Sequence, residues 1–247
     1  RVREFCQDNQ GILWIGTEDG GLNRFNPKTK TFSFFTPSNA FTNVHGLCMV
    51  GDNLWVGTFS KGVKVVDTRT GAIVKTYLKT ESPHSLVDNS VFSICRTTTG
   101  DIYLGTLFGL LRYNKQLDGF DRIPELNGKF VYDIKEDSGG NLWLATYANG
   151  AYCYNVNEKR WKNYLHDENN PKSLPYDKVV SIFEDSHRQV WLTTQGGGFC
   201  CFHSDTETFT NYSLADGLPN DVVYQIVEDK EGFFWLTTNN GLVCFQP

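Results

Sequence analysis

Hydrophobic positions in this chain fall into short alternating runs, and glycine, asparagine or aspartate follows each run. One run, ILWIGT at residues 12–17, returns as LWVGT at 54–58 and LWLAT at 142–146. Strict alternation over four to eight residues is typical of half-buried β-strands. No stretch combines the 3.6-residue period of a helix with capping residues. The pattern therefore predicts an all-β protein with almost no helix.

The aromatic residue of this phrase marks a repeat that covers the whole chain. Successive copies are 41, 48, 40, 48 and 44 residues apart. The six positions are Trp14, Trp55, Tyr103, Trp143, Trp191 and Trp235. A period of about 40–45 residues is typical of a four-stranded propeller blade. The sequence thus predicts a β-propeller of four-stranded antiparallel blades.

Each repeat divides into four strand patterns. A V-x-x-I run ends in an acidic turn, the tryptophan phrase follows, a third run comes after glycine, and a fourth is centred on a bulky residue. These outer residues are Phe32, Ile73, Phe120, Trp161 and Phe209. The expected blades span residues 1–38, 39–84, 85–126, 127–170, 171–215 and 216–247. The last blade lacks its outer strand, so we expect six blades of a seven-bladed ring within a longer multidomain chain.

The repeated phrase is interpreted as structural. The tryptophan offers a large apolar surface to the neighbouring blade, and small residues such as Gly16 and Ala145 fit a close-packed wedge. The following glycines are expected to turn the chain with φ > 0. The acidic pair before the phrase is interpreted as stabilising the turn, not as a pair of catalytic carboxylates.

Composition narrows the possible functions. Aromatic residues make up 14% of 247 residues, and the net charge of −5 is spread without a basic stripe, which argues against nucleic acid. No run approaches the ~18 apolar residues of a membrane span, so this fragment should make no membrane contact. The seven cysteines show no metal-ligand spacing and are interpreted as small buried hydrophobes. Neither a metal nor a cofactor is expected.

The repeat V-x-x-I-x-E-D-x-x-G-x-[LI]-W-[IL]-[GA]-T-x-x-G-G-L-x-[RC]-[FY]-[ND] resembles the regulator-propeller repeat of bacterial hybrid two-component systems, especially those of gut Bacteroidetes. The resemblance implies a periplasmic sensor region that detects oligosaccharides and controls transcription of polysaccharide-utilisation genes. It also implies partner domains in the same chain: a second propeller, a β-sandwich and, beyond a membrane helix, a histidine kinase. A homodimer is compatible with it.

The loops at one end of the blades are the expected ligand site. Loops between second and third strands supply Glu18, Asp19, Phe59, Lys61, Phe108, Tyr147, Asn149, Gln195 and Asn239. Blade-to-blade segments supply His45, His84, Tyr132 and Tyr176. Flat aromatic rings and planar polar groups suit an oligosaccharide, although the same mixture suits docking of another protein.

Two alternatives to a sensor remain from the sequence: a propeller enzyme such as a glycan lyase or hydrolase, and a protein-interaction scaffold. A sialidase Asp box places tryptophan five residues after aspartate, whereas Asp137 and Asp185 precede theirs by six. No nucleophile elbow, HExxH motif or phosphate loop is present. We therefore expect no catalytic residues in this fragment, and any kinase activity to lie elsewhere in the full-length protein.

Overall fold

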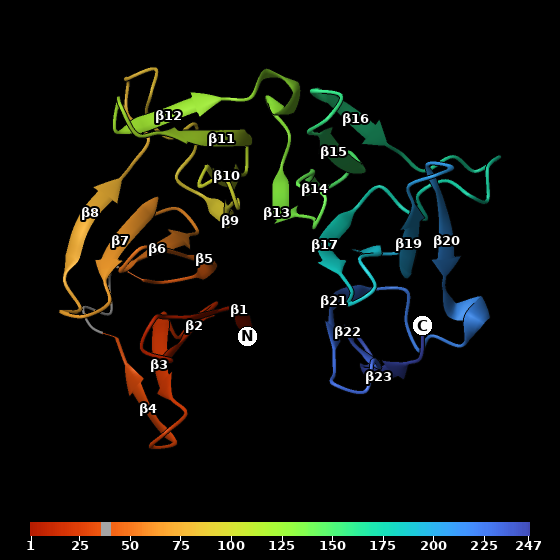
Figure 1. The fold of residues 1–247 in the computed structure, drawn as a ribbon, viewed down its shortest axis with the longest axis horizontal. Coiled ribbons are helices and arrows are strands. Elements are labelled where there is room, and N and C mark those ends of the chain that lie inside the picture. The colour runs from red at the N-terminus through yellow and green to blue at the C-terminus, as the bar shows by residue number, and fades with distance from the viewer. Residues whose placement is uncertain (36–40) are drawn as a thin grey trace. The chain divides into compact units, whose positions relative to one another are not determined.

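The computed structural model describes residues 1–35 and 41–247, and the predicted boundary between residues 38 and 39 lies outside them. All regular structure in this part is β-strand except two 3-10 turns, η2 (Pro124–Leu126) and η3 (Leu214–Asp216). The strands form six antiparallel sheets, one for each repeat (Figure 1). The protein is a six-blade β-propeller, as the repeat predicts.

The chain divides into two compact units, residues 1–131 and 132–247. Unit 1 holds three blades, each with its strands in sequence order. Blade 1 consists of β1 (Val2–Gln7), β2 (Leu13–Thr17), β3 (Leu22–Asn26) and β4 (Thr31–Phe34). Blade 2 consists of β5 (Val44–Val50), β6 (Asn53–Thr58), β7 (Val63–Asp67) and β8 (Ile73–Tyr77). Blade 3 consists of β9 (Val91–Arg96), β10 (Ile102–Thr106), β11 (Gly109–Asn114) and β12 (Gly119–Arg122).

Unit 2 holds the other three blades, and the last has three strands in the described chain. Blade 4 consists of β13 (Val131–Glu136), whose first residue belongs to unit 1, β14 (Leu142–Thr146), β15 (Ala151–Asn155) and β16 (Arg160–Tyr164). Blade 5 consists of β17 (Val179–Glu184), β18 (Val190–Thr194), β19 (Phe199–His203) and β20 (Thr208–Tyr212). Blade 6 consists of β21 (Val223–Glu228), β22 (Phe234–Thr238) and β23 (Gly241–Phe245).

Four of the repeat tryptophans are buried, namely Trp14, Trp55, Trp143 and Trp191, whereas Trp235 of blade 6 is 39% exposed. Trp143 is 2% exposed and meets Phe202 of the next blade edge-on, with ring centroids 4.8 Å apart. Trp55 meets Tyr113 in the same way at 5.0 Å. Edge-to-face pairs of this kind add about 0.5–1.5 kcal/mol to the burial of the rings. The predicted packing against the neighbouring blade is confirmed.

The small residue of the phrase lies where the next blade begins. A Cβ atom at Gly16 would be 2.6 Å from Cγ1 of Val44 on β5. At Gly57 it would be 2.9 Å from the carbonyl oxygen of Val91 on β9. Because the second strand of one blade lies so close to the first strand of the next, a side chain at Gly16 or Gly57 would separate the blades.

The acidic pair has two separate structural roles. Asp185 accepts hydrogen bonds from the indole Nε1 of Trp191 at 2.8 Å and from the backbone N–H groups of His187 and Gln189 at 2.9 and 2.8 Å. The preceding Glu184 instead accepts the backbone N–H of Ser138 in blade 4, with its two oxygens at 2.8 and 3.0 Å. Aspartate therefore locks its own turn and glutamate joins two blades, which confirms the structural interpretation of the pair.

Asp8, Asp137 and Asp229 repeat the bond to the indole of their own blade. Trp14, Trp143 and Trp191 are therefore both buried and anchored through their single polar atom, whereas Trp235 is anchored in the same way but is 39% exposed. A buried donor without a partner would cost about 1–3 kcal/mol. The six-residue spacing from aspartate to tryptophan reflects this bond.

The seven cysteines are free thiols of unequal burial. Burial raises the pKa of Cys153 to about 12 and that of Cys6 to about 11, so both thiols stay protonated near neutral pH. Cys244 is exposed, and for this residue the prediction of a buried hydrophobe is wrong. It lies on β23, an edge strand of the three-stranded sheet of blade 6.

Candidate functional site

Each blade has two ends with different roles. We call the end with the second-to-third-strand loops and the blade-to-blade segments the loop end, and the end with the other hairpin turns the turn end. At the loop end of unit 1, Arg3 on β1 forms an ion pair with Glu18 at 3.0 Å. Arg3 holds the pKa of Glu18 below its ordinary value. Asp19 beside it is exposed.

Four rings gather at the loop end of unit 1, and we call them the loop-end cluster: His45, Phe59, Phe92 and Phe130. The ring centroids of His45 and Phe92 are 4.8 Å apart, and those of Phe92 and Phe130 are 4.4 Å apart. Phe59 lies 6.2 Å from Phe92 and is 44% exposed. The cluster thus presents an exposed ring that other rings hold in place.

Sequence reasoning named His45 and Phe59 but missed Phe92 and Phe130. Phe92 is the second residue of β9, directly after Val91, just as His45 follows Val44 on β5. Because equivalent positions in two blades face the same way, the first-strand pattern held the signal for Phe92. Phe130 lies directly before β13 and its place is decided by tertiary contact.

His45 carries no charge near neutral pH. Burial and, secondarily, the positive charge of Arg3 lower the pKa of His45 to about 4. The ring therefore acts as a neutral aromatic with one donor and one acceptor nitrogen.

His84 does not share the loop-end location that was expected for it. Its carbonyl oxygen accepts the N–H of Phe120 on the outer strand β12 at 2.8 Å, and its Nδ1 is 3.4 Å from Asp121. The segment between β8 and β9 is long enough to cover the free edge of β12, so it carries His84 away from the loops. Covering an edge in this way protects unpaired backbone groups.

Two further predicted residues of unit 1 lie on its loops. Phe108, on the β10–β11 turn, is 50% exposed, and its carbonyl oxygen accepts the N–H of Gly128 at 3.0 Å. Lys61 lies half-buried on the β6–β7 loop.

In unit 2 the predicted residues form two pairs of contacts. Lys178 places its Nζ 5.0 Å from the ring centroid of Tyr147, a cation–π geometry. The backbone carbonyl oxygen of Lys178 accepts the N–H of Gln195 at 2.9 Å. The Tyr224 hydroxyl donates to Oδ1 of Asn239 at 2.7 Å. Sequence reasoning did not name Lys178 and Tyr224.

Three further predicted residues of unit 2 line the same end. Tyr176 is 37% exposed and packs on a glycine turn, where a Cβ at Gly196 would meet its ring at 3.0 Å. Asn149 lies half-buried on the β14–β15 loop, and Tyr132 is the second residue of β13. Tyr132 therefore occupies the register position that His45 and Phe92 hold in unit 1.

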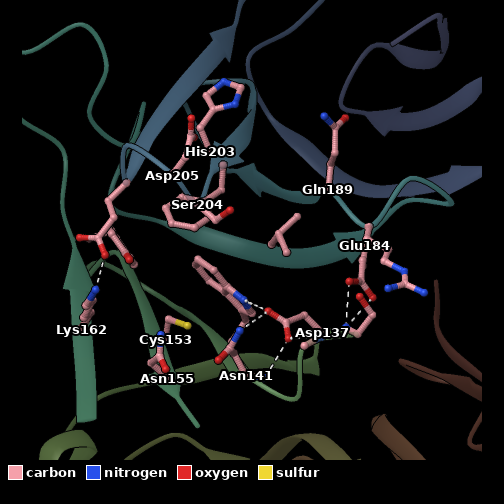
Figure 2. A pocket seen from close by; sticks show the side chains of 18 residues that line it. Asp137, Asn141, Cys153, Asn155, Lys162, Glu184, Gln189, His203, Ser204 and Asp205 are labelled. Carbon is pink, nitrogen blue, oxygen red and sulfur yellow. Dashed lines mark hydrogen bonds and ion pairs between the residues drawn. The ribbon is translucent and has the colours of Figure 1, made fainter. Parts of the chain in front are cut away.

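Two grooves lie at the turn end, where none was predicted. The unit 2 groove, between blades 4 and 5, has a volume of about 470 Å³. Figure 2 shows its labelled polar side chains, with Asp137 hydrogen-bonded at its foot and Lys162 ion-paired at one side. The unit 1 groove, between blades 2 and 3, has a volume of about 830 Å³.

Both grooves are built on the same aromatic frame. Trp55 stacks on Tyr77 at 5.4 Å in unit 1, and Trp143 stacks on Tyr164 at 5.8 Å in unit 2. A lysine of the outer strand reaches across to the acidic residue in the third-to-fourth-strand turn of the next blade. These ion pairs join Lys75 to Asp118 and Lys162 to Glu207.

Residues 1–35 and 41–247 lack two kinds of feature. No group of three or more histidine, cysteine, aspartate or glutamate side chains is placed to hold a metal ion. No helix there has the length and apolarity that spanning a membrane would require.

Comparison with known proteins supplies the family of the repeat. Residues 1–19, 125–148 and 217–240 match the model of the two-component regulator propeller. These three segments are two-component regulator propeller repeats. Regulator-propeller segments thus coincide with β1 and β2, with β13 and β14, and with β21 and β22.

The proteins that this chain resembles are much longer than the chain itself. Histidine kinase P4 of Formosa agariphila is 25% identical over 157 residues, which cover 59% of this chain and 12% of the kinase. The extracellular domain of a putative hybrid two-component system from B. thetaiotaomicron has a TM-score of 0.79 at 23% identity, covering 99% of this chain and 33% of that one. The chain therefore spans well under half the length of both.

A propeller enzyme is similar in fold as well. Virginiamycin B lyase from Staphylococcus aureus gives a TM-score of 0.72 at 16% identity, covering all of this chain and 84% of the lyase. At such low identity the likeness concerns the arrangement of blades and carries no information on chemistry.

Proposed function

We propose that this chain is the ligand-sensing part of a periplasmic sensor region in a hybrid two-component system, and that its loop-end cluster binds an oligosaccharide. The family of the repeat and the extracellular location of the structural relative support the sensor part of the proposal. Control of polysaccharide-utilisation genes would follow through a histidine kinase elsewhere in the full-length protein, as the name of the curated relative suggests.

The exposed ring of Phe59 carries the binding part of the proposal. A sugar presents an apolar C–H face and equatorial hydroxyl groups, so its recognition needs a flat ring and nearby polar atoms. Phe59 is 44% exposed, and its ring centroid lies 6.2 Å from that of Phe92 and 6.5 Å from that of His45. The neutral imidazole of His45 can donate to and accept from a hydroxyl group. Holding the ring in place before binding lowers the entropy lost on association.

The proposal includes no catalytic step in this fragment. The aspartates that come closest to an enzyme motif are engaged with tryptophan indoles: Asp137 and Asp185 each accept Nε1–H through Oδ2. A carboxylate held in this way by an indole and two backbone amides serves the fold. Signalling by a propeller without chemistry requires only that a ligand bind one conformation more tightly than another.

Calorimetric titration with a panel of neutral oligosaccharides tests the proposal. For any saccharide that binds, Phe59→Ala should weaken affinity at least ten-fold, or about 1.4 kcal/mol. Phe32→Ala is the matched control, since Phe32 is 70% exposed on the outer strand β4. The affinity of Tyr147→Ala for the same saccharides shows whether Tyr147 in unit 2 contributes to binding.

Two results would count against the proposal. Unchanged affinity in Phe59→Ala would remove the loop-end cluster as the site. Release of shorter saccharides during incubation, followed by chromatography, would show that the fragment is an enzyme.

A further inference from the structure

The two grooves at the turn end share an aromatic frame, but the charged residues that line them differ in sign. Register identifies the equivalent positions: Arg96 pairs with Ile102 at the end of β9, and Glu184 pairs with Val190 at the end of β17. An arginine in the unit 1 groove thus stands where the unit 2 groove has a glutamate. The neighbouring turn differs in the same sense, with Lys115 in unit 1 at the position of Ser204 in unit 2.

The glutamate has a structural partner that the arginine cannot use. Glu184 accepts the N–H of Ser138 in the preceding blade, and Glu228 accepts that of Ser186. Arginine has donors only, so Arg96 cannot cap the turn of blade 2 in this way. The Arg96 side chain is exposed at the groove and is released from the role that this position has in blades 5 and 6.

Ion pairing leaves two cations of the unit 1 groove without a carboxylate. Lys75 is held by Asp118, and Arg112 binds Asp101 through Nε at 3.2 Å and an η nitrogen at 2.7 Å. Within the described ranges, neither Arg96 nor Lys115 forms an ion pair.

The net charge of the two linings follows from these differences. The unit 1 groove is lined by four cationic side chains and three carboxylates, a net +1: Lys75, Arg96, Arg112, Lys115, Asp101, Asp118 and Asp121. The unit 2 groove is lined by two cations and four carboxylates, a net −2, apart from His203: Lys162, Arg188, Asp137, Glu184, Asp205 and Glu207. Only the first would attract an anion.

We propose that the unit 1 groove binds an acidic saccharide, with Arg96 and Lys115 holding a carboxylate or sulfate group of the sugar. Arginine and lysine are the usual partners of such oxyanions. The groove, at about 830 Å³, has room for a sugar ring beside them. The anionic part of the inference rests on the groove alone, and the saccharide part rests on the proposed function.

Titration of the chain with trigalacturonate, galactotriose and inorganic sulfate tests the inference. Trigalacturonate should bind at least ten-fold more tightly than galactotriose, and sulfate should compete with it. Affinity should fall when sodium chloride is raised from about 0.05 to about 0.5 M, because salt shortens the range of charge attraction.

Two variants copy the unit 2 residues into unit 1. Arg96→Glu and Lys115→Ser should each weaken trigalacturonate binding at least ten-fold, while Arg188→Glu in the unit 2 groove should leave it unchanged. Lys115 lies on an exposed turn, so Lys115→Ser keeps the test valid if Arg96→Glu fails to fold.

Several outcomes would overturn the inference: equal affinity for the neutral trisaccharide, full affinity in both variants, or no binding of either anion up to about 10 mM. Competition by sulfate together with equal affinity for both sugars would show a site for a free anion and no sugar site. Loss of binding in Phe59→Ala with full binding in both groove variants would overturn this inference and support the loop-end proposal. Full binding in Phe59→Ala with loss of binding in both groove variants would support this inference and count against the loop-end cluster as the site for this ligand.

Discussion

In unit 2, each of the three turns between first and second strands carries an aspartate bonded to the tryptophan of its own blade, whereas in unit 1 blade 1 alone has this arrangement. Blade 2 has Val50 at the aspartate position by strand register, followed by a two-residue turn, Gly51-Asp52. Blade 3 has Thr97 there, whose hydroxyl accepts the N–H of Asp101 at 3.0 Å, and Tyr103 replaces the tryptophan.

The difference shows that one backbone frame tolerates two kinds of turn. A carboxylate with two oxygens can hold backbone amides and an indole at once, whereas a threonine hydroxyl serves the turn alone. Where the glutamate is absent, the side chain at its position does not have to accept a backbone N–H of the preceding blade. In unit 1 one such side chain is Arg96 at the groove, so the less strongly locked turn is also the one with charge available for a ligand.

The largest effect is expected from removing an aspartate of unit 2. Asp185→Ala leaves a buried indole N–H and two backbone amides without their acceptor, so it should lower the free energy of unfolding by about 3 kcal/mol. Thr97→Ala in unit 1 should cost about 1 kcal/mol, because it removes weaker, neutral hydrogen bonds. Urea denaturation followed by tryptophan fluorescence measures both.

Asp205→Ala is the control for Asp185→Ala, since Asp205 lies exposed on the β19–β20 turn and should change stability by less than about 0.5 kcal/mol. Equal losses in Asp185→Ala and Thr97→Ala would break the comparison, because the turns would then depend on their backbone alone.

A smaller effect is expected from the link between blades. Glu184→Ala removes the acceptor of the Ser138 N–H and should lower the free energy of unfolding by about 1 kcal/mol. Arg96→Ala, at the equivalent position of unit 1, should leave stability within about 0.5 kcal/mol of the original protein. Thermal unfolding by calorimetry compares the two variants. A greater loss in Arg96→Ala would mean that this arginine serves the fold.

The smallest effect concerns the loop end of unit 1, where burial suppresses a charge. His45 has a pKa of about 4 in the folded protein and near 6.5 when unfolded, so unfolded chains bind the extra proton between these values. Stability is therefore full above about pH 6.5 and is lost as pH falls toward 4.

His45→Gln should reduce the loss of stability between pH 7.5 and 5.0 by about 1 kcal/mol, allowing for the solvent that still screens the ring. His187→Gln, at an exposed position of the β17–β18 turn, is the control. The measurement is the urea midpoint at both pH values. An identical loss in His45→Gln and the original protein would show that the ring is charged in the fold.

Much of the fold could be predicted because each repeated residue acts within its own blade or against the next one. The spacing from Asp185 to Trp191 and the small residue at Gly16 recur since every blade meets the same packing problem. The loop end was predicted for His45 and Phe59, which occupy positions with a fixed register. His84 was misplaced because the segment that carries it differs in length and packs against an outer strand.

The grooves could not be predicted, because they require side chains from two blades at a known separation. Lys75 and Asp118 are ordinary surface residues in the sequence, and only the packing of blade 2 on blade 3 makes them partners. The exposed Cys244 likewise follows from its place on an edge strand, which the cysteine pattern does not reveal.

By itself the sequence determined the blades: their number, strand order and register follow from alternation, turn residues and a period near 44, all of which are local properties of the chain. The tertiary structure alone decided which surfaces are hollow and which charges lack partners. Burial and ion pairing depend on distances between residues that are remote in sequence, and free energies at those distances change with separations of a few ångströms.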